Sequence, residues 1–200
     1  MGKAYESLSE DFMARKVLII SGHPALSTIS TANRTIIDEY RKLDPSAEVR
    51  DLGALYPDFK IDAKAEQEAL TKADVIVFQF PVYWYQAPSL MKKWFEDVFT
   101  HGFAYGTGGD KLHGRTMLVS CTTGSPEEAY TPQGSNSHPM EFYLNNYEQT
   151  AKMCGMKYAK PLIAYGMVYI PGVMDDKAKA AVVEKARAQA KVLKAEIDAL

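Results

Sequence analysis

Apolar and polar positions follow two different periods along the chain, and the two periods alternate. Short segments rich in apolar residues, typical of strands in a buried parallel sheet, predict strands at residues 16–21, 48–52, 74–80, 115–121 and 158–165. Apolar residues three and four positions apart, typical of one buried helix face, and polar runs of helix-forming residues predict helices at 30–43, 63–72, 88–100, 139–154 and 175–200. A strand is therefore followed by a helix throughout the chain.

This alternation predicts parallel pairing of the strands and a three-layer α/β fold. Right-handed crossovers leave few topologies, and five strands with this spacing fit a flavodoxin-like five-stranded parallel sheet of order 2-1-3-4-5. We expect a single domain over residues 15–200. Residues 1–14 are polar and acidic, and we expect them to be a flexible N-terminal extension.

Composition narrows the classes of partner. The net charge of the 200-residue chain is −2, so charge indicates neither a nucleic acid nor a membrane surface as partner. The two cysteines, Cys121 and Cys154, are interpreted as core residues in a reducing compartment. No apolar run reaches the ~20 residues of a membrane helix, and no signal peptide is visible. We therefore expect a cytoplasmic protein, and no metal site.

The first loop with unusual chemistry follows the first predicted strand and covers residues 21–33. It is rich in hydroxyl groups and leads into a helix. A helix N-terminus presents unpaired backbone N–H groups and the positive end of its dipole, which binds phosphate. Ser30, Thr31 and the Asn33 amide are candidate donors. Because the loop has no lysine of the nucleotide P-loop type, neutral donors would hold the phosphate. An ordinary helix cap is the alternative.

The second loop, residues 81–86, follows the third strand and carries three adjacent aromatic residues, Tyr83, Trp84 and Tyr85. Aromatic side chains are costly to leave in water, so they cover a flat partner or pack into a neighbour. The backbone of such a loop can hydrogen-bond the edge of a ring system while Trp84 packs on the ring. A place in the core or in a dimer interface is the alternative.

The third loop, residues 122–130, follows the fourth strand. Gly124 allows close approach of the backbone to a ligand, and Thr122 and Thr123 offer hydroxyl and amide donors. Open α/β sheets bind ligands at the carboxyl ends of their strands, and all three loops leave such ends. Together they favour a flavin as the flat partner.

Several motifs carry a resemblance to a known family. They are His23-Pro24 with Ser30-Thr31-Ala32-Asn33, Phe80-Pro81-Val82-Tyr83-Trp84-Tyr85 with Pro88, Gly102-Phe103-Ala104-Tyr105-Gly106, and Thr122-Thr123-Gly124 with Tyr130. Over residues 17–169 the chain resembles the flavodoxin-like NAD(P)H:quinone oxidoreductases. The bacterial branch of that family includes regulatory flavoproteins of glutathione-gated potassium efflux systems. Two features depart from the family pattern. Ser125 stands where the family often has a second glycine, and the first loop is about one residue longer than in close bacterial relatives.

The resemblance implies a tightly bound flavin, FMN in short chains of this type and FAD in the longer ones. In the family the first loop takes the flavin phosphate, and the second and third loops hold the isoalloxazine ring. The cofactor-binding residues implied for this chain are His23, Ser30, Thr31, Ala32, Asn33, Pro81, Val82, Tyr83, Trp84, Tyr85, Gln86, Thr122, Thr123, Gly124 and Ser125.

The resemblance also implies an activity. NAD(P)H would pass hydride to the flavin and leave, and a quinone on the same ring face would then be reduced by two electrons in a ping-pong cycle. Tyr130 and His138 are the implied catalytic residues for charge handling, with the Thr123 and Gly124 amides as further donors to the reduced flavin. Tyr105 would line the substrate slot and face the flavin of a partner subunit, which implies a homodimer.

Other functions stay open. One is an electron carrier like flavodoxin, although such carriers tend to be strongly acidic and this chain is near neutral. A second is a regulatory subunit that has a membrane transporter as a transient partner. Reduction of azo or nitro compounds is a neighbouring activity, because reduced flavin reacts with many small acceptors.

Overall fold

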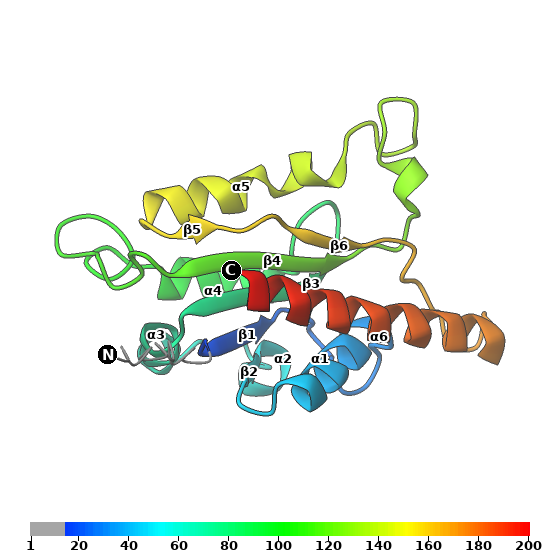
Figure 1. The fold of residues 1–200 in the computed structure, drawn as a ribbon, viewed down its shortest axis with the longest axis horizontal. Coiled ribbons are helices and arrows are strands. Elements are labelled where there is room, and N and C mark those ends of the chain that lie inside the picture. Colours follow the sequence, from blue (N-terminus) through cyan, green and yellow to red (C-terminus); the bar gives the residue numbers. More distant parts are fainter. Residues whose placement is uncertain (1–14) are drawn as a thin grey trace, which may run out of the picture.

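The structure, a computed structural model, describes residues 15–200, and the predicted extension 1–14 lies outside the described residues. Figure 1 shows one parallel sheet between two layers of helices. Its strands are β1 (Val17–Ser21), β2 (Glu48–Asp51), β3 (Val75–Pro81), β4 (Thr116–Thr122), β5 (Lys157–Tyr158) and β6 (Leu162–Ala164). The order is β2-β1-β3-β4-β5, with β6 also paired to β4, so the predicted fold class and strand order are confirmed.

The predicted fifth strand at 158–165 is two short strands. β5 pairs with the start of β4 and β6 with its end. Pro161 stands between them, and a proline has no N–H group to donate to a neighbouring strand. The pairing is therefore interrupted at this point and resumes at Leu162.

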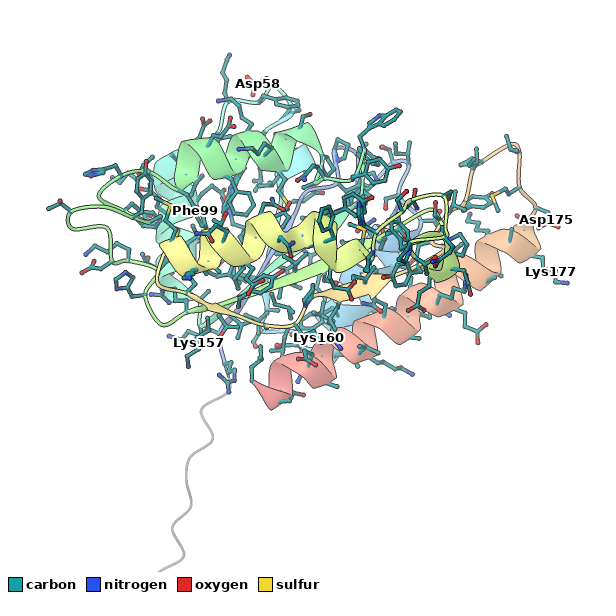
Figure 2. The ribbon with its side chains drawn as sticks, turned by 90° about the horizontal axis from the view of Figure 1, so that it is seen from above. Asp58, Phe99, Lys157, Lys160, Asp175 and Lys177 are labelled. Carbon is teal, nitrogen blue, oxygen red and sulfur yellow. The ribbon has the colours of Figure 1, made fainter. Side chains whose placement is uncertain are left out.

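The helices are α1 (Ala32–Leu43), α2 (Leu52–Leu55), α3 (Ala63–Lys72), α4 (Ser89–Val98), α5 (Met140–Met153) and α6 (Asp176–Ala199), with a short 3-10 turn at Glu127–Ala129. α2 is a single turn, too short for a helical period to predict. Figure 2 shows Asp175 beside the first turn of α6, at the end of the molecule opposite Lys157, where β5 starts. The start of α6 therefore lies near the carboxyl ends of the strands.

Two apolar clusters form the core, one on each face of the sheet. Alternate residues of the central strands, such as Leu18 and Phe78, pack against α2, α3, α4 and α5. The intervening residues, such as Ile19 and Val77, pack against α1 and α6. Burial on both faces explains why the central strands are apolar at nearly every position. Within residues 15–200 no helix is both long enough and apolar enough to cross a membrane.

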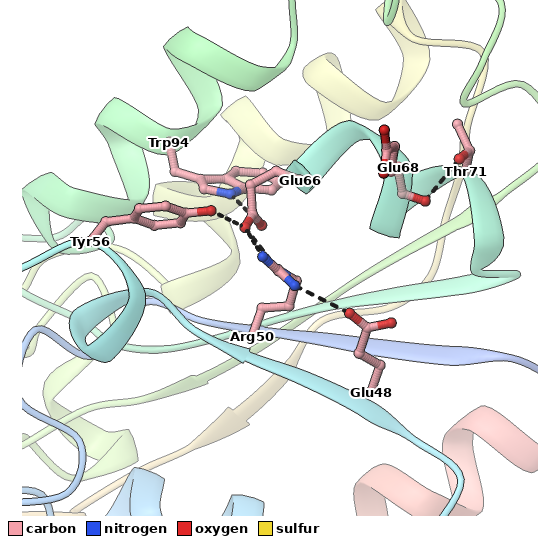
Figure 3. A network of polar contacts seen from close by, with 7 residues as sticks. All are labelled: Glu48, Arg50, Tyr56, Glu66, Glu68, Thr71 and Trp94. Atoms are coloured by element: carbon pink, nitrogen blue, oxygen red, sulfur yellow. Dashed lines mark hydrogen bonds and ion pairs between the residues drawn. The ribbon is translucent and has the colours of Figure 1, made fainter. Parts of the chain in front are cut away.

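A buried carboxylate joins the elements on the α4 side of the sheet (Figure 3). The Glu66 side chain on α3 is fully buried, and its Oε1 accepts hydrogen bonds from Arg50 Nε at 2.7 Å and Nη2 at 2.6 Å. The Tyr56 hydroxyl donates to the same oxygen at 2.5 Å, and Trp94 Nε1 on α4 donates to Oε2 at 2.9 Å. Burial and the hydrogen bond to Glu66 raise the pKa of Tyr56. The network thus fixes α4 relative to α3 and β2.

We predict that Glu66→Ala lowers the free energy of unfolding by about 3 kcal/mol, because it leaves the Arg50 guanidinium and two further donors without their shared acceptor. Glu68→Ala, at an exposed position on the same helix, is the matched control and should change stability by less than about 0.5 kcal/mol. Urea denaturation of the two variants measures both values. Equal effects of the two substitutions would contradict the role assigned to the network.

Candidate functional site

A cavity of about 530 Å³ lies at the carboxyl ends of β1, β3 and β4, the right-hand edge of the sheet in Figure 1. This size is typical of small-molecule sites. The lining residues come from the three predicted loops and from one further segment. They are His23, Ile29, Ser30, Thr31, Ala32, Asn33, Pro81, Val82, Tyr83, Thr122, Thr123, Gly124, Met167, Val168, Tyr169, Ile170 and Pro171.

Just behind the cavity wall lies a row of buried polar side chains, here called the polar floor, although the preceding part of the sheet is apolar. On the face covered by α1, one in-register row across the three central strands consists of Ile19, Val77 and Leu118. The next row, two residues further along each strand, consists of Ser21, Gln79 and Ser120. All three polar side chains are fully buried. The face therefore changes from apolar to polar just before the strands end.

A chain of hydrogen bonds crosses this floor. Gln79 Nε2 donates to Asn33 Oδ1 at 2.7 Å, and Asn33 Nδ2 donates to Thr122 Oγ1 at 2.9 Å. All three side chains are buried, and they come from β3, α1 and β4. The chain of bonds thus holds the first turn of α1 over the ends of β3 and β4.

The N-terminus of α1 opens into the cavity and suits an anion. Its N-cap residue, Thr31, makes no side-chain capping hydrogen bond, and the first turn has no acidic residue. The first N–H groups of a helix have no partner within the helix and lie at the positive end of its dipole. Ser30 Oγ accepts from the Arg34 N–H at 3.3 Å, and the Arg34 guanidinium donates to the Ser27 carbonyl at 2.8 Å. The donors that face the cavity are therefore neutral.

The aromatic loop is a tight two-residue turn. Tyr83 N donates to the Gln86 carbonyl at 2.8 Å, and Gln86 N donates to the Tyr83 carbonyl at 3.1 Å. Trp84 and Tyr85 have φ of +50° and +65°, a left-handed backbone conformation that residues other than glycine rarely adopt. The turn's own bonds use the N–H groups of Tyr83 and Gln86, and those of Trp84 and Tyr85 make no hydrogen bond within residues 15–200. Backbone strain of this kind gathers at ligand sites.

Only part of this loop reaches the cavity. Pro81, Val82 and Tyr83 line it, whereas Trp84 is 92% exposed and does not. The Tyr85 ring stacks on Tyr143 with ring centroids 4.9 Å apart, and its hydroxyl donates to Asn136 Oδ1 at 3.3 Å. Gln86 lines a different groove. Within one chain the indole of Trp84 thus lies in solvent, and its packing on a bound ring stays a prediction.

In the third loop Thr122, Thr123 and Gly124 line the cavity, and Ser125 does not. The Thr123 N–H donates to the Ala164 carbonyl at 2.9 Å, and its hydroxyl donates to the Ser125 carbonyl at 2.8 Å. Both donors of Thr123 thus have acceptors within the protein, and a contact of its amide with a flavin stays a prediction. A Cβ added at Gly124 would lie 3.8 Å from Val168 Cβ, so space next to this glycine is open.

The three predicted catalytic residues do not line the cavity of a single chain. Tyr130 is only 8% exposed and packs beside the Tyr165 ring, with centroids 5.6 Å apart. Burial raises the pKa of Tyr130, opposed by the side chains of Thr123 and Ser125. His138 stacks on Phe142 before α5, with centroids 4.3 Å apart. The catalytic roles of Tyr130 and His138 stay predictions.

Tyr105 lies in the connection between α4 and β4 and packs edge-on against His101. This connection leads into the amino end of β4, whereas the cavity lies at the carboxyl end. The two sites are therefore at opposite edges of the sheet. Tyr105 can contribute to a flavin site only if it belongs to another copy of the chain.

Sequence reasoning missed the fourth lining segment, Met167 to Pro171, which follows β6. Met167 N donates to the Thr123 carbonyl at 2.7 Å, so the segment is attached to the third loop. Gly166 and Gly172 flank it with φ of +64° and +78°. Apart from the Tyr169 hydroxyl the segment has no hydroxyl or charged group, and the other signal was its position after the carboxyl end of a strand, which it shares with the other three loops.

A second cavity of about 560 Å³ lies between α4 and α5, where Phe95, Phe99 and Tyr147 contribute to its walls. It is slightly larger than the cavity at the strand ends, but the buried polar row and the hydrogen-bonded chain of Gln79, Asn33 and Thr122 lie at the strand ends and not beside it. We therefore assign the ligand site to the cavity at the strand ends.

Residues 15–192 match the family described as having a flavodoxin-like fold. The chain belongs to this family. The resemblance inferred from the motifs is thereby confirmed at the level of the family.

Three similar proteins illustrate the range of this flavodoxin-like family. The glutathione-regulated potassium-efflux system ancillary protein KefG of Cronobacter sakazakii is 47% identical over 75% of this chain and 80% of its own. The uncharacterized NAD(P)H oxidoreductase YrkL of Bacillus subtilis is 39% identical over 78% of this chain and 88% of its own. The crystal structure of general stress protein 14 from Treponema denticola, in complex with FMN, is 34% identical with a TM-score of 0.79, and covers 90% of this chain and 99% of its own.

His23 is the one histidine of the cavity, and its tautomer follows from its contacts. Its Nδ1 accepts the Ala25 N–H at 3.0 Å, so in the neutral ring the proton is on Nε2. Burial lowers the pKa of His23 below its ordinary value of 6.5. The flavodoxin-like domain thus holds His23 as a neutral donor at neutral pH.

This gives a pH prediction. Because the folded state lowers the pKa, the contribution of neutral His23 to stability is present above pH 6.5 and is lost as the pH falls through the folded value. His23→Asn keeps an acceptor for the Ala25 N–H and removes the titration. Urea denaturation at several pH values should show wild-type stability falling more steeply than that of the variant below about pH 6.5. Parallel profiles would contradict this reading of His23.

Proposed function

We propose that the cavity at the strand ends binds FMN. The observation that carries the proposal is the meeting of three features at one cavity: a helix N-terminus whose cap residue Thr31 makes no side-chain hydrogen bond, a polar floor, and a strained turn that lines the cavity through Tyr83. FMN combines a phosphate, a polyol chain and a flat ring, one group for each feature. The FMN complex of the Treponema denticola relative supports the proposal.

The residues divide among these groups by their chemistry. The first turn of α1, with Ser30 and Thr31, would hold the phosphate through neutral donors. Thr122 and Asn33 offer buried polar atoms to the polyol. The N–H groups of the aromatic turn and of Gly124 suit the polar edge of the ring. FAD is the alternative cofactor, and its additional nucleotide would extend past the rim formed by Ile29 and Ile170.

The activity that we propose is an FMN-dependent NAD(P)H:quinone oxidoreductase. When bound, a flavin supplies two-electron chemistry between a nicotinamide and an acceptor. The protein would bind the flavin, orient it and offer exposed aromatic side chains, Tyr83 and Trp84, against which planar substrates can stack. The nicotinamide ring of the reductant and the quinone are both flat, so one slot can serve them in turn. The Bacillus subtilis relative, named as an NAD(P)H oxidoreductase, supports this class of activity.

A second candidate function is a regulatory role toward a membrane transporter. The observation that favours it is the 47% identity to an ancillary protein of a potassium-efflux system in Cronobacter sakazakii. The exposed Trp84 offers an apolar contact for such a partner. Retention of a potassium transporter from detergent extracts by the tagged protein, abolished by Trp84→Ala, would favour this function. An equal yield with the variant would count against docking through Trp84.

The enzyme proposal predicts a yellow protein whose chromophore, released by denaturation, chromatographs as FMN. NADH or NADPH added without oxygen should bleach the flavin absorption, and a quinone should restore it. Because both substrates use one slot, initial rates against NAD(P)H at several quinone concentrations should give parallel lines. A protein that takes up neither FMN nor FAD would contradict the cofactor assignment, and intersecting lines would contradict the shared slot.

A homodimer is the second prediction of this proposal, since only another copy can bring Tyr105 to the cavity. Sedimentation should give a species of twice the 22.3 kDa chain mass. Tyr105→Ala should reduce quinone turnover without loss of FMN, because the residue would contact the acceptor rather than the cofactor. A fully active monomer would contradict the prediction.

A further inference from the structure

Gln79 has no part in the proposed function so far, yet it lies at the centre of the polar floor. It is the middle residue of the buried row, between Ser21 on β1 and Ser120 on β4. The oxygen atoms Ser21 Oγ, Gln79 Oε1 and Ser120 Oγ have no hydrogen-bond partner among residues 15–200. A buried polar atom without a partner lowers stability. Packing alone would favour apolar residues, as in the row two residues earlier.

The hydrogen bonds that start at Gln79 have a direction. Gln79 donates to Asn33, and Asn33 donates to Thr122. Suppose that the nitrogen and oxygen of both side-chain amides, Gln79 and Asn33, exchanged places. The Gln79 amide nitrogen would then have no acceptor, and both of its hydrogens would be buried and unpaired. In the observed direction the unpaired atom is an oxygen instead. Unpaired buried N–H groups are rarer in proteins than unpaired carbonyl oxygens, so the observed direction is favoured.

The direction has a consequence for the cavity. Thr122 Oγ1 accepts the hydrogen of Asn33, so the Thr122 hydroxyl must donate its own hydrogen elsewhere. Within residues 15–200 we find no acceptor for it, and Thr122 lines the cavity. The hydroxyl is thus left as a hydrogen-bond donor toward whatever occupies the cavity.

We propose that Gln79 is a positioning residue for the ligand. Through Asn33 it keeps the Thr122 hydroxyl as a donor toward an acceptor oxygen of the ligand, on a phosphate ester or a polyol. Gln79 does not line the cavity itself. The inference rests on the proposed binding of FMN and assigns to that site a residue behind the cavity wall.

The test is a double-mutant cycle with FMN as the probe, read by the quenching of flavin fluorescence. Gln79→Met keeps the volume and removes the donor, and Thr122→Val removes the hydroxyl. Each single variant should bind FMN about 10-fold more weakly, the loss of roughly one hydrogen bond. The double variant should be no weaker than Thr122→Val alone, because Gln79 acts only through that hydroxyl. Thr122→Ser keeps the hydroxyl, so the effect of Gln79→Met should persist in that background.

Controls separate positioning from folding. Gln67→Met removes another partly buried glutamine amide, which donates to the Val98 carbonyl at 2.9 Å, far from the cavity. This variant should have a lower midpoint of thermal unfolding than the wild type and the same affinity for FMN. Gln79→Glu provides a second variant if Gln79→Met does not fold. Its carboxylate can only accept hydrogen bonds, so the direction of the hydrogen bonds through Asn33 is reversed, and FMN binding should also be about 10-fold weaker.

The outcomes divide cleanly. Additive losses in the double variant, or wild-type affinity in a folded Gln79→Met, would overturn the positioning role while FMN binding by the wild type stands. A wild-type protein that binds no FMN would overturn the proposed function, and the inference with it.

Discussion

The hydrogen-bond chain from Gln79 through Asn33 to Thr122 is the contact on which the geometry of the candidate site depends. It joins β3, α1 and β4 at the point where the sheet ends. Because Asn33 lies in the first turn of α1, the chain sets where the helix N-terminus stands over the strand ends. The same hydrogen bonds therefore hold together the polar floor and the end of the cavity that suits a phosphate, so a change in one alters the other.

The strained turn needs support from both ends. On one side Pro81 is in register with Thr122 at the end of β4, and Val82 N donates to the Thr122 carbonyl at 2.8 Å. On the other side α4 is fixed by Trp94, which donates to the buried Glu66. The left-handed backbone of Trp84 and Tyr85 is costly by itself, and these two anchors hold it in place. Stability on the α4 face is thus linked to the shape of the site on the α1 face.

Much of the fold could be predicted from the sequence, because it follows from local patterns. Apolar runs gave the central strands, and their spacing gave the order. The split at Pro161 required knowing which strand pairs with which, and a period cannot supply that. Among the site loops, the residue types located the first and third, whereas the orientation of Trp84 depends on a positive φ that no pattern near it signals. Met167 to Pro171 was missed because all its residues except Tyr169 are apolar, although they reach the same end of the sheet. Gln79 did carry a signal, as the one polar residue within the apolar strand Val75–Pro81.

A crystal structure of the protein with FMN would test the central claim most directly. The account predicts that the phosphate lies at the first turn of α1 and that Thr122 Oγ1 lies within hydrogen-bond distance, about 2.5–3.0 Å, of a ligand oxygen. It also predicts that the amides of Trp84 and Tyr85 face the ring. FMN in the cavity between α4 and α5, or FMN at the strand ends with Thr122 turned away from every ligand oxygen, would contradict the account.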